Sequence, residues 1–120
     1  MKQIIIDFPD IFISVNQQYG SVRFGKTTMP RIRLTMRAKV YKEAVGWECK
    51  RAYKGKPLEG PVKVSIWYWF TSKRQDLGND KITMDAMENI IYKNDRQIHE
   101  MHLYKNYAKK PRTKIIVEEL

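Results

Sequence analysis

The segment at 61–70, PVKVSIWYWF, constrains the fold most, because its side chains alternate strictly between two sets. The first set is apolar and comprises Val62, Val64, Ile66, Tyr68 and Phe70. The second set comprises Lys63, Ser65, Trp67 and Trp69. A period of two is typical of a β-strand, whose successive side chains point to opposite faces of a sheet. The two tryptophans predict that a helix or a partner subunit covers the second face as well, since exposed they would form a sticky patch.

The other segments predict the elements that surround this strand. Residues 2–8 are apolar and β-branched and predict a strand that stops at Pro9, whereas residues 9–32 are expected to be irregular. Apolar residues three or four apart predict a helix from Thr35 to near Gly55, with a buried face of Leu34, Ala38, Tyr41, Val45, Cys49 and Ala52. A second helix is expected over 79–92, a turn at 93–95, and strands over 96–104 and 113–117.

These elements predict one domain over residues 1–120, because a chain of 120 residues can bury a single modest core. Their order is strand, loop, helix, strand, helix, strand, strand. The expected fold class is α/β (α+β), with a mixed β-sheet and two helices packed on one face of it in a second layer.

The charge of the chain points to an anionic partner. The formal net charge is +10, and seven basic residues lie between Arg23 and Lys42 with no acid among them. Such a run favours a nucleic-acid backbone or an anionic membrane surface, and the alternative is a solvated face. No apolar run approaches the roughly 20 residues that span a bilayer. The aromatic residues follow strand and core patterns and not an amphipathic basic helix, so no membrane-surface partner is expected either. The single Cys49 has no internal disulfide partner and suits a reducing cytoplasm.

Against this basic background, carboxylates gather in the segment KRQDLGNDKITMDAM at 73–87. Asp76, Asp80 and Asp85 come after Lys73 and Arg74 in this segment, and Asp95 lies in the predicted turn. Mg²⁺ prefers oxygen ligands and keeps several waters, so a few carboxylates suffice to hold it. The alternative is that these acids cap the second helix or lie on its surface. Spacing alone does not join Asp95 to Asp76, since a turn at the far end of a helix need not return to its start.

The same residues resemble the motifs of the RusA family of Holliday-junction resolvases, small dimeric endonucleases of bacteria and their phages. The family's central motif is D-x-D-N-x-x-K-x-x-x-D-A-L, and a D-D-x-Q-[IV] element follows it. This chain matches the first with Asp76, Asn79, Lys81, Asp85, Ala86 and Met87, and the second with Asn94 to Ile98. Phe8-Pro9 and Ser14 to Tyr19 are similar to the family's N-terminal loop, and Leu34 to Val45 to its first helix. The resemblance covers nearly the whole chain in the right order.

The resemblance implies roles for individual residues. Asp76 and Asp95 would bind Mg²⁺, with Mn²⁺ as a possible substitute, and Lys81 would be the active-site lysine, while the role of Asp85 stays open. The family's second aspartate falls at Gly78, and one residue is missing between Asn79 and Lys81. We therefore expect Asp80 to replace the lost carboxylate as a third metal ligand. The alternative is a site that is short of a ligand.

The resemblance also implies a reaction, the hydrolysis of phosphodiesters by paired nicks across a four-way DNA junction. The expected catalytic residues are Asp76, Asp80, Lys81 and Asp95. The expected protein is a cytoplasmic homodimer of a bacterial host, with encoding by a phage or prophage as an alternative origin. DNA contacts are expected from Asn16, Arg23, Lys26, Arg31, Arg33, Arg37, Lys73 and Arg74. No small-molecule cofactor is expected. The alternative is a nucleic-acid-binding module that cuts junctions poorly or not at all.

Overall fold

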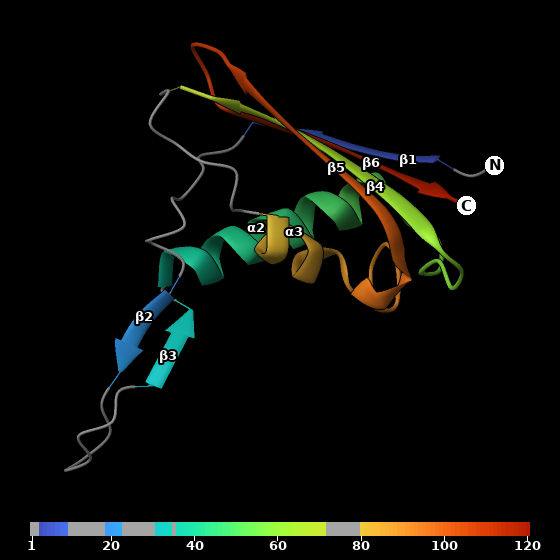
Figure 1. The fold of residues 1–120 in the computed structure, drawn as a ribbon, viewed down its shortest axis with the longest axis horizontal. Helices are drawn as coiled ribbons and strands as arrows, with labels where there is room; N and C mark the ends of the chain where they lie inside the picture. Colours follow the sequence, from blue (N-terminus) through green and yellow to red (C-terminus); the bar gives the residue numbers. More distant parts are fainter. Residues whose placement is uncertain (1–2, 10–18, 23–30, 35, 72–79) are drawn as a thin grey trace.

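A four-stranded mixed sheet is the main element of the computed structural model, which describes residues 3–9, 19–22, 31–34, 36–71 and 80–120 (Figure 1). For residues 19–22, 31–34, 37 and 80 only the backbone is described. The strand order is β1-β6-β4-β5. The strands are β1 (Gln3–Phe8), β4 (Val62–Phe70), β5 (Ile98–Tyr107) and β6 (Arg112–Glu119). β4 is parallel to β5, whereas β6 is antiparallel to both of its neighbours, β1 and β4.

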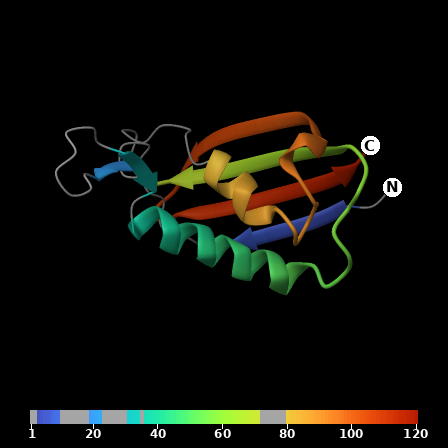
Figure 2. The same ribbon diagram turned by 90° about the horizontal axis from the view of Figure 1, so that it is seen from below.

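Two helices, α2 (Met36–Ala52) and α3 (Asp80–Met87), pack on one face of this sheet (Figure 2). The two-layer α+β architecture predicted from the sequence is therefore confirmed. None of the helices in the described ranges is both long and apolar enough to cross a membrane.

The alternation in β4 separates the two faces of the sheet as predicted. Its apolar set, from Val62 to Phe70, is almost completely buried beneath the helices. On the opposite face, Trp67 stacks on Tyr104 of β5 with ring centroids 4.9 Å apart, and the Arg112 guanidinium lies 4.6 Å from the Trp69 ring. Side chains of the neighbouring strands thus cover the two tryptophans in part, and both described helices lie on the other side.

The first helix presents the predicted apolar face to the core. Ala38, Tyr41, Val45 and Cys49 are buried, whereas Ala52 at the end of the helix is exposed. A buried hydroxyl group ties the layers together, because Thr83 Oγ1 of α3 lies 3.3 Å from both Tyr41 Oη of α2 and Tyr68 Oη of β4. Buried hydroxyls paired in this way fix the position of α3 against the helix and strand beside it.

The second helix is shorter than predicted, since α3 ends at Met87 and not at residue 92. Asn89 adopts the left-handed conformation (φ 64°), and its backbone N–H donates to Tyr92 O at 2.7 Å. Asparagine tolerates this conformation better than most residues and often ends a helix just after its cap. Ile91 and Tyr92 are buried although they are not helical. The apolar residues beyond Met87 are therefore explained by their place in the core and not by a longer helix.

The prediction that residues 9–32 are irregular is wrong for its described part. Strands β2 (Tyr19–Val22) and β3 (Arg31–Leu34) pair antiparallel in a separate two-stranded sheet. Four-residue strands are too short to show a period in the sequence, and their pairing depends on a partner segment. β5 begins two residues later than the predicted strand, because residues 95–97 form a 3₁₀ turn, η1 (Asp95–Gln97).

Candidate metal centre

The candidate site lies on the connection between β4 and β5. Two adjacent parallel strands need a crossover, because the chain must return to the end at which the first strand began. Here the described part of that crossover contains α3, the turn at 88–92 and η1. The carboxylates of this segment therefore gather where β5 begins.

Three carboxylates meet on the crossover: Asp85 of α3, Glu88 just after it and Asp95 of η1. One oxygen of each lies within 4.8 Å of the others, and all three residues are half-buried. Two oxygens on opposite sides of a Mg²⁺ ion are about 4.2 Å apart. Small rotations of the side chains would therefore bring the three groups to one cation. Carboxylate oxygens are the ligands that Mg²⁺ and Mn²⁺ prefer, so the donor set fits the implied metal.

The end of α3 turns Glu88 toward Asp95. Asp85 and Glu88 are three residues apart, a spacing that places side chains on one face of a helix. Glu88 N donates to Asp85 O at 3.3 Å, and Glu88 Oε1 accepts a hydrogen bond from Asp95 N at 3.3 Å. The left-handed Asn89 then reverses the chain directly after Glu88. The turn therefore brings an acid from before it and an acid from after it together.

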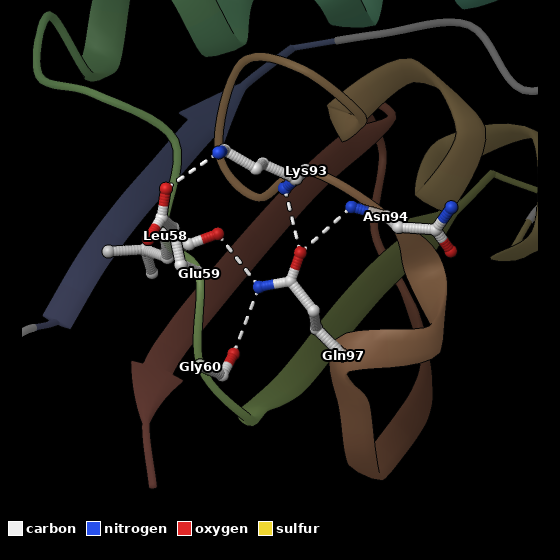
Figure 3. Close-up of polar contacts among 6 residues, drawn as sticks. All are labelled: Leu58, Glu59, Gly60, Lys93, Asn94 and Gln97. Atoms are coloured by element: carbon white, nitrogen blue, oxygen red, sulfur yellow. Dashed lines mark hydrogen bonds and ion pairs between the residues drawn. The ribbon is translucent and has the colours of Figure 1, made fainter.

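The side chain of Gln97 ties the turn before Asp95 to the loop that leads into β4 (Figure 3). Its Nε2 donates to Leu58 O at 2.7 Å and to Gly60 O at 2.9 Å. Its Oε1 accepts from the backbone N–H groups of Lys93 and Asn94, both at 2.9 Å. One amide thus satisfies four backbone groups on two segments and fixes the backbone next to Asp95.

Asn94 has a structural role in this turn. Its Oδ1 accepts from Arg96 N at 2.9 Å, and with Gln97 it forms a capping box at the start of η1. Reciprocal capping of this kind satisfies backbone donors that a helix start leaves open. The Asn94 oxygen is therefore engaged by backbone, and Asp95 is the residue of the pair that joins the carboxylate cluster.

Tyr92 lies buried behind the carboxylates. Burial raises the pKa of its hydroxyl, and the negative charges of Glu88, Asp95 and Asp85 raise it further. The hydroxyl is thus held in its neutral form and donates to Met84 O at 2.6 Å. This hydrogen bond joins the turn at 88–92 back to α3, so the segment that begins with Glu88 is anchored at a buried point.

Lysines lie next to the acids on their open side. Lys39 and Lys42 of α2 line a hollow of about 500 Å³ together with Glu43, Asp85, Ala86 and Glu88. Lys81 is exposed on α3 four residues before Asp85, a spacing that makes the two side chains neighbours on the helix surface. A phosphate entering this hollow would meet cations and the carboxylate cluster at the same time.

Asp95 is the one predicted metal ligand whose side chain the structure describes, and it lies in the cluster. Asp76 lies outside the described residues, and Asp80 is described only as the first residue of α3. Among the predicted DNA contacts, Arg31, Arg33 and Arg37 lie on β3 and α2 with backbone alone described. Asn16, Arg23, Lys26, Lys73 and Arg74 lie outside the described residues.

Glu88 was missed by the sequence analysis, and Asp85 had no assigned role there. The signal that could have found Glu88 is its position three residues after Asp85, which is one turn along a helix. That signal is weak without the structure, because the approach of Asp95 depends on the turn between Asn89 and Asn94.

The chain was compared with protein-family models and with curated proteins. The family model for endodeoxyribonuclease RusA matches residues 14–118, which is most of the chain. Among curated proteins, none matches this chain closely enough to serve as a relative.

Proposed function

The chain belongs to the RusA endodeoxyribonuclease family, and we propose on that premise that it is a Mg²⁺-dependent nuclease that resolves four-way DNA junctions by paired symmetric nicks. The observation that carries the proposal is the cluster of Asp85, Glu88 and Asp95 in a chain of net charge +10. Acids beside a DNA-binding surface repel phosphates unless a cation lies between them. A protein that only bound DNA would gain nothing from this cluster.

In this proposal Asp85, Glu88 and Asp95 hold the cation, and Asp76 and Asp80 of the preceding segment complete its ligand set. Mn²⁺ would substitute for Mg²⁺, since both take oxygen ligands. When bound, the cation supplies neutralisation of the charge that develops on the phosphate and a lowered pKa of a water molecule. Tyr92 holds the turn that begins at Glu88, and Gln97 holds the backbone next to Asp95, so the two side chains keep these ligands in position.

The cations of the chain position the substrate. Lys81, next to Asp85 on α3, would stabilise the leaving oxygen or the equatorial oxygens of the phosphate. Lys39 and Lys42 would bind the scissile strand in the hollow beside the acids. The arginines and lysines predicted from the sequence to contact DNA would bind phosphates of the junction arms independently of base sequence.

Paired symmetric nicks require two active sites related by a twofold axis, so we propose that the active form is a homodimer. Exposed apolar side chains support an interface. Ile5 and Tyr104 on the outer face of the sheet are 50% and 43% exposed. A role in DNA recombination and repair follows from the substrate.

A nicking assay on a synthetic four-way junction tests the proposal. We expect wild-type protein to nick two opposing strands with Mg²⁺ and none with a chelator. Asp85→Asn, Glu88→Gln and Asp95→Asn should each lower the rate by more than roughly 100-fold, because even the outer-shell partners of metal ligands are worth roughly 10- to 100-fold. Junction binding should stay intact or tighten, since the loss of a carboxylate removes repulsion.

Glu100→Gln is the matched control, because Glu100 is an exposed acid on β5 outside the cluster. Its rate should equal that of wild type. Wild-type protein that binds junctions with high affinity but does not nick them with Mg²⁺ or Mn²⁺ would contradict the proposal and favour a binding module.

A further inference from the structure

Trp47 is an exposed tryptophan on the solvent side of α2, with 64% of its surface accessible. The buried face of this helix is formed by Ala38, Tyr41, Val45 and Cys49. Residue 47 follows Val45 by two positions, about 200° around an α-helix, and therefore lies on the opposite side. The core of the protein makes no use of this ring, and a tryptophan left in water calls for another explanation.

The ring lies in a hollow lined mainly by basic residues. Lys50 Nζ lies 5.0 Å from the centroid of the Trp47 ring. A hollow of about 370 Å³ is lined by Trp47, Glu48, Lys50, Arg51 and Lys54. Arg51 and Glu48 form an ion pair at 3.3 Å and balance each other, so Lys50 and Lys54 give the hollow a net positive charge.

A ligand that matches this hollow carries negative charge next to a flat aromatic group. An unpaired nucleotide has both, because its base can stack on an exposed ring while lysines bind its phosphates. A second copy of this chain is a poorer match, since its own Lys50 and Lys54 would meet those of the first copy. Resting on the DNA substrate proposed above, we propose that Trp47, Lys50 and Lys54 bind, by stacking and ion pairing, a nucleotide that becomes unpaired where the strands of that substrate exchange.

The position of this site relative to the metal centre supports the proposal. Lys39 and Lys42, which line the hollow beside Asp85 and Glu88, lie on the same helix as Trp47 and Lys50. Lys50 is eight residues beyond Lys42, about 12 Å along the helix axis. That is a distance of roughly three to four nucleotides at the rise of a duplex strand. A strand laid along α2 from the acids would therefore bring a nearby nucleotide to Trp47.

Binding measured in the presence of chelator tests the proposal without any need for cleavage. We expect Trp47→Ala to weaken binding of a labelled single-stranded oligonucleotide by roughly 5- to 150-fold, the equivalent of one lost base stack. Trp47→Phe should retain most of the affinity because it keeps an aromatic face. Binding of a blunt duplex should be unchanged by either variant, since its bases are already stacked in pairs.

The lysines are tested through the salt dependence of the same binding. Lys50→Gln combined with Lys54→Gln should make the negative slope of log K against log salt shallower by about 1.4. Each phosphate contact to a single strand contributes about 0.7 to the magnitude of that slope. Lys109→Gln combined with Lys110→Gln is the matched control. These lysines are exposed in the turn between β5 and β6, and their removal takes the same charge from the chain. The control should leave the slope unchanged.

Three results would overturn the proposal. Trp47→Ala protein that is folded by circular dichroism and binds single strands like wild type excludes stacking. An equal loss of affinity for single strand and duplex assigns the effect to general electrostatics. If Trp47→Ala differs from wild type in molar mass by light scattering while its DNA affinity is unchanged, this face is a contact between protein copies. None of these results depends on nicking, so the failure of this inference and the failure of the proposed nuclease are separate observations.

Discussion

Cys49 is a buried thiol whose chemistry follows from its surroundings. It is fully buried on the inner face of α2, and burial raises the pKa of its thiol to about 12, with Glu48 adding to the effect. Only the thiolate attacks reagents or binds metals, so the folded protein holds Cys49 in an inert form at neutral pH. The sequence analysis placed Cys49 on the buried face of the first helix, and the structure confirms that position.

We expect Cys49 to react with an aromatic disulfide at pH 8 roughly a thousandfold more slowly in the folded protein than in denaturant. At that pH the thiolate fraction is about 10⁻⁴ for a pKa near 12, against about a quarter for a free thiol. The rate in the folded protein should rise with pH toward 12, because deprotonation becomes easier. Absorbance of the released thiol measures both rates. Equal rates with and without denaturant would contradict the burial of Cys49.

Asp80 and Glu88 are both proposed as ligands, and their variants test which of them contributes more to the metal site. Asp80→Asn should slow nicking as strongly as Asp95→Asn if Asp80 binds the metal. If Asp80 only interacts with the helix dipole, the substitution should instead lower the free energy of unfolding by about 0.3–1 kcal/mol and leave the nicking rate unchanged. The cluster geometry leads us to expect that Glu88→Gln is at least as damaging as Asp80→Asn. Nicking rates of the two variants at saturating Mg²⁺, with urea unfolding as a control for stability, decide between them.

Single residues show how far sequence reasoning reached into the site. Asp95 was singled out through a family motif, and it lies in the cluster. Motif position did not predict the structural role of Asn94, because its capping bond appears only when η1 is formed. Glu88 belongs to no motif element, and its role depends on a reversal of the chain at Asn89. Such reversals are set by local conformation and by burial of the following residues, which a residue pattern does not report.

Gln97 links two segments and carries a prediction about the turn it holds. Gln97→Ala removes four hydrogen bonds to backbone groups, at Leu58, Gly60, Lys93 and Asn94. We expect the free energy of unfolding to fall by about 1–3 kcal/mol, since only part of these backbone groups can then form hydrogen bonds with water instead. Mg²⁺ binding should weaken as well, because the backbone next to Asp95 loses its anchor. Urea unfolding and titration calorimetry measure the two effects.

Gln3→Ala serves as the comparison for Gln97→Ala. The Gln3 side chain donates one exposed hydrogen bond to Glu118 Oε1 at 2.9 Å, and it lies on β1, the edge of the sheet opposite β5. Its removal should change stability by no more than about 0.5 kcal/mol and leave Mg²⁺ affinity as it was. If the two variants lost metal affinity equally, Gln97 would have no special role in holding Asp95.

Among the helices and strands, those with a long pattern of their own were predicted best. The nine residues of β4 and the seventeen of α2 each repeat their period several times, and both elements lie within a few residues of the expected ranges. Ile90 and Ile91 continued the apolar spacing of the second helix, yet the left-handed Asn89 ends it. β2 and β3 were missed because each is defined by its partner. Local patterns predict elements, whereas pairing and chain reversal need the whole fold.

The molecule as a whole should be a dimer in solution. Light scattering at micromolar concentration should give twice the chain mass of 14.3 kDa, because symmetric cutting needs two sites in one particle. The measurement should be repeated in high salt, where contacts that are mainly electrostatic weaken. A mass of one chain under all conditions, with and without junction DNA, would contradict the proposal that one protein particle makes both nicks.

The place of β6 in the sheet has a consequence for how the protein is made. β6 is the last strand along the chain but lies inside the sheet, between β1 and β4. Gln3 pairs with Glu118, so more than a hundred further residues must be synthesised before β1 can pair with β6, its neighbour in this sheet. Contacts so distant in sequence form slowly. A ribosome must therefore release nearly all of this chain before the sheet closes, and until then β1 and β4 expose edges that can pair with other chains.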